Sequence, residues 1–98
     1  MTTYDRTLLA RAAQAAGKSR AEWDYDWLVE RGVDVSRDML WNPLTNSGQA
    51  LELAVDLSLF DGLERRASEI AAAANYDMCP REATRRAITQ AAAATVAA

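Results

Sequence analysis

The chain has 98 residues, of which 50% are hydrophobic and 26% charged, and its formal net charge is -3. This length predicts a single domain, residues 1–98, and the composition is that of a folded globular protein. The sequence contains no histidine and only one cysteine, Cys79. This excludes intrachain disulfides, a histidine-based catalytic triad and the usual cysteine–histidine zinc sites. We therefore expect a protein that is not an enzyme and has no catalytic residues, metal or cofactor.

The sequence also lacks the signals that are typical of secretion, of a membrane helix and of direct nucleic-acid binding. Met1 is not followed by the charged and apolar regions of a secretion signal, and no apolar run reaches the roughly 20 residues that a membrane helix needs. No basic stripe with interleaved aromatic residues is present, which disfavours direct binding of nucleic acid. We expect a cytoplasmic protein that does not bind membranes.

The first predicted element is a helix over residues 4–16. Leu8, Ala12 and the alanines that follow recur at three- and four-residue spacing, and Gly17 is placed to end the helix in a left-handed cap. Alanine favours helix but contributes little buried area, so we expect the core to come from the few large apolar residues. The core candidates are Leu8, Leu9, Leu28, Val29, Val33, Val35, Leu40, Trp41, Leu44, Leu51, Leu53, Val55, Leu57, Leu59, Phe60, Leu63, Ile70 and Ile88.

The pattern changes over residues 23–35. Aromatic and acidic side chains alternate over residues 23–27, and two valines flank Asp34, which is the two-residue period of a half-buried strand. With a turn at Arg31-Gly32, this predicts a short hairpin. The alternative is a helix over residues 21–31. On a strand, Asp24 and Asp26 would share a face, and we expect a solvated polar face there rather than a Mg²⁺ site or a catalytic pair.

This acidic and aromatic segment is the most unusual feature of the sequence. If the aromatic side chains face inward they belong to the core. If they are exposed they form a binding hot spot, because Trp and Tyr dominate binding energetics and carboxylates favour a basic partner. The predicted partner-binding residues are Glu22, Trp23, Asp24, Tyr25, Asp26, Trp27, Glu30 and Asp34.

Residues 42–60 contain a turn, a helix and a short strand. Asn42-Pro43 interrupts regular structure, and Asn46 followed by Gln49 resembles a capping box. The helix that it begins runs to about Leu57, with Ala50, Leu53 and Ala54 on its core face. Residues 57–60 then resemble a strand entering a turn.

Two more helices complete the expected fold. Residues 63–76 are predicted as a helix from their propensity, and Pro80 is suited to the first turn of the last helix. In that helix Glu82 and Arg86 form an i,i+4 pair. The fold class that we expect is α+β, with three or four helices packed on a short antiparallel sheet or hairpin.

Residues 41–57, WNPLTNSGQALELAVDL, resemble the signature of the phage ABA-sandwich domain family. In these small phage and prophage proteins a Trp-Asn-Pro turn leads into an amphipathic helix. Residues 82–93 resemble the closing helix of the family. The resemblance implies a central sheet between helices, a phage-borne gene and expression in a bacterial cytoplasm. It carries no functional residues to this chain.

These observations lead to two functional hypotheses. The first is a host-interaction or counter-defence protein that binds and inhibits a bacterial protein, such as an anti-CRISPR, because an acidic surface can occupy a site meant for a phosphate backbone. The alternative is a binder that sequesters a nucleotide, stacking its base on Trp23, Tyr25 or Trp41 and holding its phosphate with Arg81 or Arg85. For Trp41, a structural role with Pro43 at the corner before the helix is the first interpretation.

Self-association is a further expectation. The few large apolar residues would leave a monomer with a thin core, whereas alanine faces allow helices to approach closely. Ala12 with Ala16, or Ala87 with Ala91, would form such a face between two copies. We therefore expect a homodimer.

Overall fold

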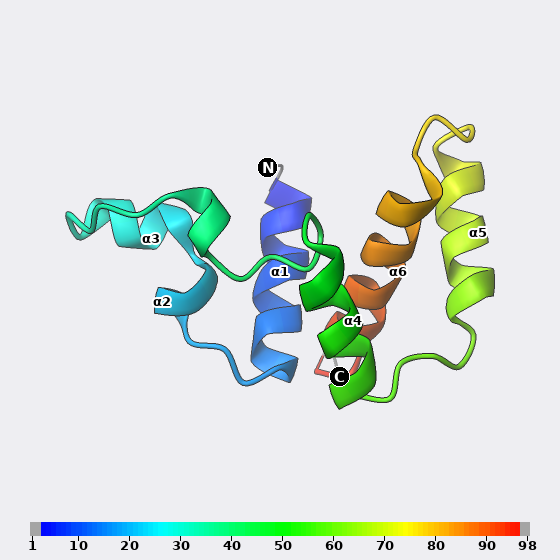
Figure 1. Cartoon of the computed structure of the whole chain (residues 1–98), viewed down its shortest axis with the longest axis horizontal. Helices are drawn as coiled ribbons and strands as arrows, with labels where there is room; N and C mark the ends of the chain where they lie inside the picture. The colour runs from blue at the N-terminus through cyan, green and yellow to red at the C-terminus, as the bar shows by residue number, and fades with distance from the viewer. Residues whose placement is uncertain (1–2, 97–98) are drawn as a thin grey trace.

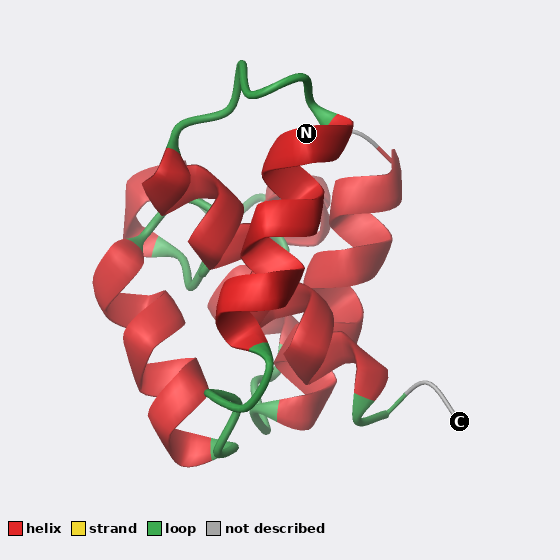
Figure 2. Ribbon diagram, turned by 90° about the vertical axis from the view of Figure 1, so that its right-hand side faces the viewer, coloured by secondary structure: helices red, strands yellow, loops and turns green. Residues whose placement is uncertain are grey.

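The computed structural model describes residues 3–96, and this part of the chain folds into six α-helices and one short 3₁₀ helix. In chain order these are α1 (Thr3–Ala15), α2 (Arg20–Trp23), α3 (Tyr25–Glu30), η1 (Arg37–Met39), α4 (Ser47–Asp56), α5 (Leu63–Ala73) and α6 (Pro80–Ala94). Helix α6 packs on α1, α4 and α5 (Figures 1 and 2). Residues 20–40, which contain α2, α3 and η1 and which we call the arm, extend to one side of this bundle (Figure 1).

Residues 3–96 contain no strand, so the predicted α+β fold is wrong, and so is the central sheet that the family resemblance implied. The segment predicted as a hairpin is two short helices that meet at Asp24, whose φ of -91° and ψ of 89° are not helical. This break changes the helical phase between Trp23 and Tyr25. The two-residue spacing of the aromatic residues is therefore compatible with two short helices and does not require a strand. The alternative of a helix over residues 21–31 was closer to the structure.

The strand predicted at residues 57–60 is also wrong. Helix α4 ends instead in a left-handed turn at Ser58, whose φ is 55°. The amide of Ser58 donates to the carbonyl of Val55 (3.3 Å) and that of Leu59 to the carbonyl of Ala54 (2.9 Å), which is the Schellman arrangement of a helix C-terminus. The turn brings Leu59 against the main apolar core.

The other helices are confirmed close to their predicted limits, because local capping determines where they begin and end. At the end of α1, Gly17 has a φ of 72° and the amide of Lys18 donates to the carbonyl of Ala13 (2.8 Å). At the start of α4, the side chain of Asn46 accepts from the amide of Gln49 (2.9 Å). The side chain of Gln49 accepts from the amide of Asn42 (2.6 Å), so it anchors the preceding turn rather than completing a capping box.

The core lies where α1, α4 and α6 meet, and alanine supplies much of it. Leu9 is almost completely buried, and Ala12, Ala54 and Ala87 have no exposed surface. Small side chains let the helix axes approach closely, so burial comes from the many contacts between closely spaced backbones. The expectation that large residues alone would form the core is therefore wrong. Of the large core candidates, the exposed ones are Val29, Val33, Leu51, Val55 and Phe60.

The same packing occupies the alanine faces that we expected between two copies. Ala12 and Ala87 are fully buried within one chain, and Ala16 packs against the same core. A homodimer would need another surface.

Within residues 3–96, no helix combines the length and hydrophobicity that crossing a bilayer requires.

Candidate functional site

A cleft of about 910 Å³ lies between the arm and the N-terminal halves of α1 and α6. Residues 40–46, which lead from the arm into α4, form a further part of its wall. The cleft brings together five residues that the sequence singled out. They are Trp23, Asp24, Tyr25, Asp26 and Trp41. Its walls carry both charged and aromatic side chains.

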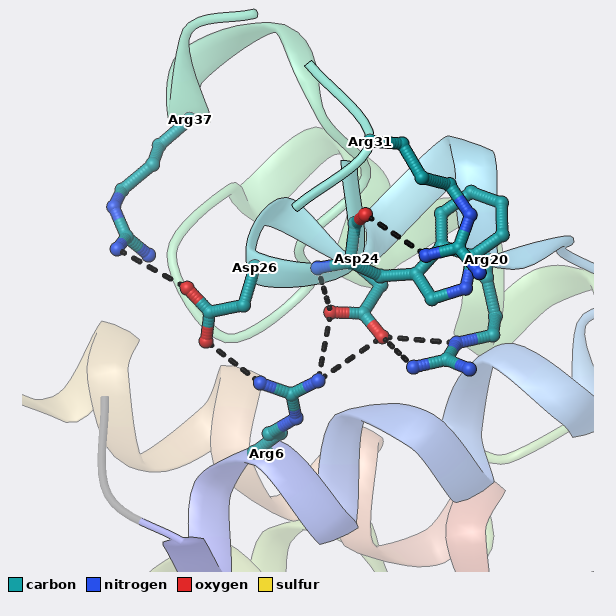
Figure 3. Close-up of polar contacts among 7 residues, drawn as sticks. Arg6, Arg20, Asp24, Asp26, Arg31 and Arg37 are labelled. Carbon is teal, nitrogen blue, oxygen red and sulfur yellow. Dashed lines mark hydrogen bonds and ion pairs between the residues drawn. The ribbon is translucent and has the colours of Figure 1, made fainter. Parts of the chain in front are cut away.

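Asp24 is the centre of a charged network at the base of the arm (Figure 3). Its carboxylate accepts hydrogen bonds from Arg6 Nη2 (3.0 Å) on α1 and from Arg20 Nη2 (2.9 Å) on α2. It also accepts from the amide of Trp27 (3.3 Å), which makes it the N-cap of α3. The side chain is only 3% exposed. The solvated position that we predicted for Asp24 is therefore wrong, because the break between α2 and α3 turns it toward α1.

Asp26 remains at the surface but is also paired. Its carboxylate receives Arg6 Nη1 at 2.6 Å and lies 4.0 Å from Arg37 Nη2. Arg6 thus bridges the two aspartates, with one nitrogen on each carboxylate (Figure 3). The guanidinium of Arg6 lies between the two carboxylates, in the position that a shared divalent cation would occupy. Among residues 3–96 there is no group of three or more possible metal ligands.

Arginines also cover the faces of two aromatic residues in the arm. The guanidinium carbon of Arg31 lies 3.9 Å from the ring centroid of Trp27, and that of Arg20 lies 5.3 Å from it. Arg37 lies 3.9 Å from the ring centroid of Tyr25. These are cation–π distances, and they hold both half-buried rings in place. Residues within the arm therefore occupy ring faces that a partner was predicted to contact.

The remaining aromatic residues of the predicted sites have structural roles. Trp23 is half-buried and packs against the main core, as the inward-facing alternative required. Trp41 is buried, and its amide donates to the carbonyl of Glu22 (2.8 Å), which joins the base of the arm to the turn before α4. Pro43 in that turn is also buried, in agreement with the structural corner predicted for these residues.

The two arginines proposed for phosphate binding do not line the cleft with Trp41. Arg85 donates to the carbonyl of Leu44 (3.0 Å) and to Ser47 Oγ (3.1 Å), so it fastens the turn before α4 to α6. Arg81 is exposed in the first turn of α6. The structure therefore does not assemble Trp41, Arg81 and Arg85 into one nucleotide site.

Sequence reasoning missed the ion pairs of the cleft, including one that joins α1 to α6. Arg86 donates to both carboxylate oxygens of Asp5, at 2.7 and 3.3 Å. The sequence analysis had predicted an i,i+4 pair between Arg86 and Glu82 instead. The hydrogen bonds to Asp5 raise the pKa of Arg86, outweighing the opposite effect of its partial burial. Asp5 and Arg86 lie 81 positions apart in the chain. No local pattern could have shown that they meet.

The arm also carries exposed residues outside its charged network, and we call them the outer surface, although one of them, Asp38, also lines the cleft. Three apolar residues are exposed there, and each is next to an exposed carboxylate in the sequence. The neighbouring pairs are Val29 with Glu30, Val33 with Asp34, and Met39 with Asp38. Only Glu30 and Asp34 were among the predicted partner-binding residues. Both Val29 and Val33 were interpreted as core residues, and Val33 was also placed on a half-buried strand because it alternates with Asp34 and Val35.

The carboxylates of this outer surface differ from those at the base of the arm. Within residues 3–96, no ion pair engages Glu30, Asp34 or Asp38. Glu22, also predicted to bind a partner, accepts from the amide of Ser19 (2.7 Å) and so caps α2. The predicted site therefore separates into a structural base and an exposed outer surface.

No family model, curated protein or solved structure matches this chain.

Proposed function

We propose that this chain acts by binding another protein through the outer surface of the arm, and that the partner is a bacterial protein whose activity it inhibits without catalysis. The observation that supports this is the outer surface itself, where each exposed apolar residue is next in the sequence to an exposed carboxylate that has no ion pair within residues 3–96. Apolar contacts surrounded by charged groups are the usual composition of a protein interface.

The distribution of charge supports a basic partner. Residues 20–40 contain six acidic and three basic residues, a formal charge of -3, and the rest of the chain contains eight of each. The whole formal net charge of the protein therefore lies on the arm. A charge concentrated in this way steers a basic surface toward the arm and disfavours acidic partners.

The base of the arm supports binding by holding the outer surface in one conformation. Asp24 and Arg6 fasten the arm to α1, and Gly32, with a φ of 75°, ends α3 in a Schellman cap. In this cap the amide of Val33 donates to the carbonyl of Leu28 (3.1 Å). A surface that is already ordered loses less conformational entropy when a partner binds.

The class of partner follows from charge and from the family resemblance. The resemblance of residues 41–57 to phage proteins supports a target in the cytoplasm of a bacterial host. An acidic arm presents the same charge as a phosphate backbone, so it can compete for a surface that binds nucleic acid. The partner that we propose is a nucleic-acid-targeting defence complex, which would make the chain a counter-defence inhibitor of the anti-CRISPR type.

Capture from a bacterial lysate tests the proposal. The tagged chain is compared with the triple variant Glu30→Gln, Asp34→Asn and Asp38→Asn. We expect a basic protein to be retained by the wild type and its affinity for the variant to fall at least about tenfold, with the largest difference at low salt.

The matched control removes the same number of charges from exposed positions outside the arm, with Glu52→Gln, Asp56→Asn and Asp61→Asn. We expect this control to retain the partner, because a local surface rather than net charge determines binding. Equal loss of binding in both triple variants would contradict the role of the arm. Failure of the wild type to block nucleic-acid binding by the captured complex would contradict inhibition.

A further inference from the structure

The cleft between the arm and the bundle contains more carboxylates than arginines. Five acidic and three basic residues line it, which gives the lining a formal charge of -2. Asp5, Asp24 and Asp26 each form an ion pair with an arginine of the same lining. Asp38 and Glu82 form no ion pair within residues 3–96. Two carboxylates of the cleft are therefore not neutralised by a cation of the described chain.

These two carboxylates belong to the two sides of the cleft. Asp38 lies in η1 of the arm and is exposed, whereas Glu82 lies in the first turn of α6 and is half-buried. A cation that enters the cleft is therefore attracted both by the arm and by the bundle. Attraction between charges is stronger in a partly enclosed cleft than on an open surface, because less water screens it.

The cleft already holds guanidinium groups of its own chain. Arg6 Nη1 lies 2.6 Å from the carboxylate of Asp26 (Figure 3), and the guanidinium carbon of Arg37 lies 3.9 Å from the ring centroid of Tyr25. The planar guanidinium has several N–H donors and can engage more than one carboxylate at once, which an ammonium group does less well. Tyr25 and Leu40 are half-buried in the lining and offer apolar surface to the methylene groups of a long side chain.

An anion fits this cleft less well than a cation. Arg6, Arg37 and Arg86 are the arginines of the lining, and each already lies within ion-pair distance of an aspartate. A phosphate or a carboxylate would have to break one of these ion pairs to bind. The chemistry of the cleft therefore selects a positively charged group.

We propose that the cleft binds an arginine side chain of the partner protein. The inference rests on the proposed function for the source of this side chain, and it adds the group that the chain recognises. Asp38 lines the cleft and also belongs to the outer surface, next to Met39, which is 79% exposed. A partner that covers Met39 therefore reaches the cleft from its Asp38 side. The volume of about 910 Å³ is ample for one side chain.

Titration of the isotope-labelled chain with N-acetyl-arginine amide, followed by amide chemical shifts, tests the site without the partner. We expect saturable binding with a Kd on the order of 1 mM at low salt, and shifts at the amides of Leu40, Thr45 and Glu82. N-acetyl-citrulline amide has nearly the same shape without the charge and should not bind. N-acetyl-lysine amide should bind at least about threefold more weakly, because it lacks the planar fork.

Substitutions of the two unpaired carboxylates locate the binding. Glu82→Gln and Asp38→Asn should each weaken the binding of N-acetyl-arginine amide about threefold, and the double variant about tenfold. The matched control is Glu52→Gln, which removes one carboxylate from an exposed position of α4 and should leave the Kd unchanged. The amide spectra should show that each variant keeps the fold.

Shifts that do not saturate, or that lie outside the cleft, would overturn the proposal. So would an equal loss of binding in Glu52→Gln, or equal binding of the citrulline compound. Capture from lysate separates this inference from the proposed function. A captured partner whose affinity does not change with Glu82→Gln would overturn the arginine site and leave the outer surface as the interface. Saturable binding of N-acetyl-arginine amide without capture of a basic protein would contradict the proposed function and leave the arginine site.

Discussion

The bundle and the arm are held together by different forces. In the bundle, α1, α4 and α6 meet through apolar side chains, and Ala12 and Ala87 have no exposed surface. The arm is fastened through charge, with Asp24 placed between Arg6 of the bundle and Arg20 of the arm. Close packing makes the bundle one cooperative unit, whereas a few polar contacts can open without unfolding the rest. We therefore expect that the arm can be altered without loss of the fold.

The apolar contacts of the arm agree with this difference. Leu28 is the buried residue of α3, and it lies outside both apolar clusters of the bundle. Trp23 is the aromatic residue of the arm that packs against the main cluster. The outer surface consequently depends on the charged base for its position, and substitutions can separate the two kinds of stabilisation.

The largest effect is expected in the bundle. Leu9→Ala removes a side chain that is 2% exposed and leaves a cavity between helices, so it should lower the free energy of unfolding by about 3 kcal/mol. Urea denaturation followed by circular dichroism measures this change. The loss should be the same at low and high salt, because no charge is involved. A loss below about 1 kcal/mol would show that the bundle does not depend on its apolar core.

Asp24→Ala should have the next largest effect and should act on the arm. It removes the N-cap of α3 and partly buried hydrogen bonds to two arginines, at an expected cost of about 2 kcal/mol. Hydrogen exchange should accelerate in residues 25–30, while the amides of α6 should change less. Uniform acceleration across the chain would show that the arm and the bundle open together.

Two further variants, one at Asp24 and one at Asp26, separate the contributions of the two carboxylates. Asp24→Asn should fall between Asp24→Ala and the wild type, because an amide oxygen can still accept from the amide of Trp27. Asp26→Ala should cost less than about 1 kcal/mol, because this carboxylate is exposed and its ion pairs are screened by water. The same residue type would thus have different effects two positions apart.

Small effects are also expected at two helix caps, one in each region. Gly32 in the arm and Ser58 in the bundle both have left-handed conformations, with φ values of 75° and 55°. Gly32→Ala should destabilise by about 1 kcal/mol, because a side chain disfavours this conformation. No heavy atom beyond the two neighbouring residues lies within 4 Å of the added Cβ, so the effect comes from the backbone alone. Thermal denaturation measures it.

Ser58→Gly should have the opposite sign, with a gain of about 0.5 kcal/mol from relief of the same strain. A destabilising Ser58→Gly would contradict the comparison of the two caps.

The sequence by itself determined the helices whose ends depend on neighbouring residues. Gly17 ends α1, Asn46 begins α4 and Pro80 begins α6, each through a contact or a backbone restriction within a few positions. Such local chemistry does not depend on the rest of the molecule, so it can be recognised from a short window. The residues Glu30 and Asp34, which stay predictions as partner-binding residues, are exposed, and an acidic residue at a surface needs no tertiary partner.

Only the tertiary structure decided the fold class, the role of the charged base and the use of alanine. Trp23, Tyr25 and Trp27 fit a strand equally well until Asp24 is seen to break the helix and bind Arg6, 18 positions earlier. Asp5 and Arg86 meet across 81 positions. An alanine face predicts a close contact between helices, but it does not indicate whether that contact lies within one chain or between two. Long-range partners are selected by the packing of whole helices, and the spacing of residues along the chain does not encode which of several compatible partners will meet.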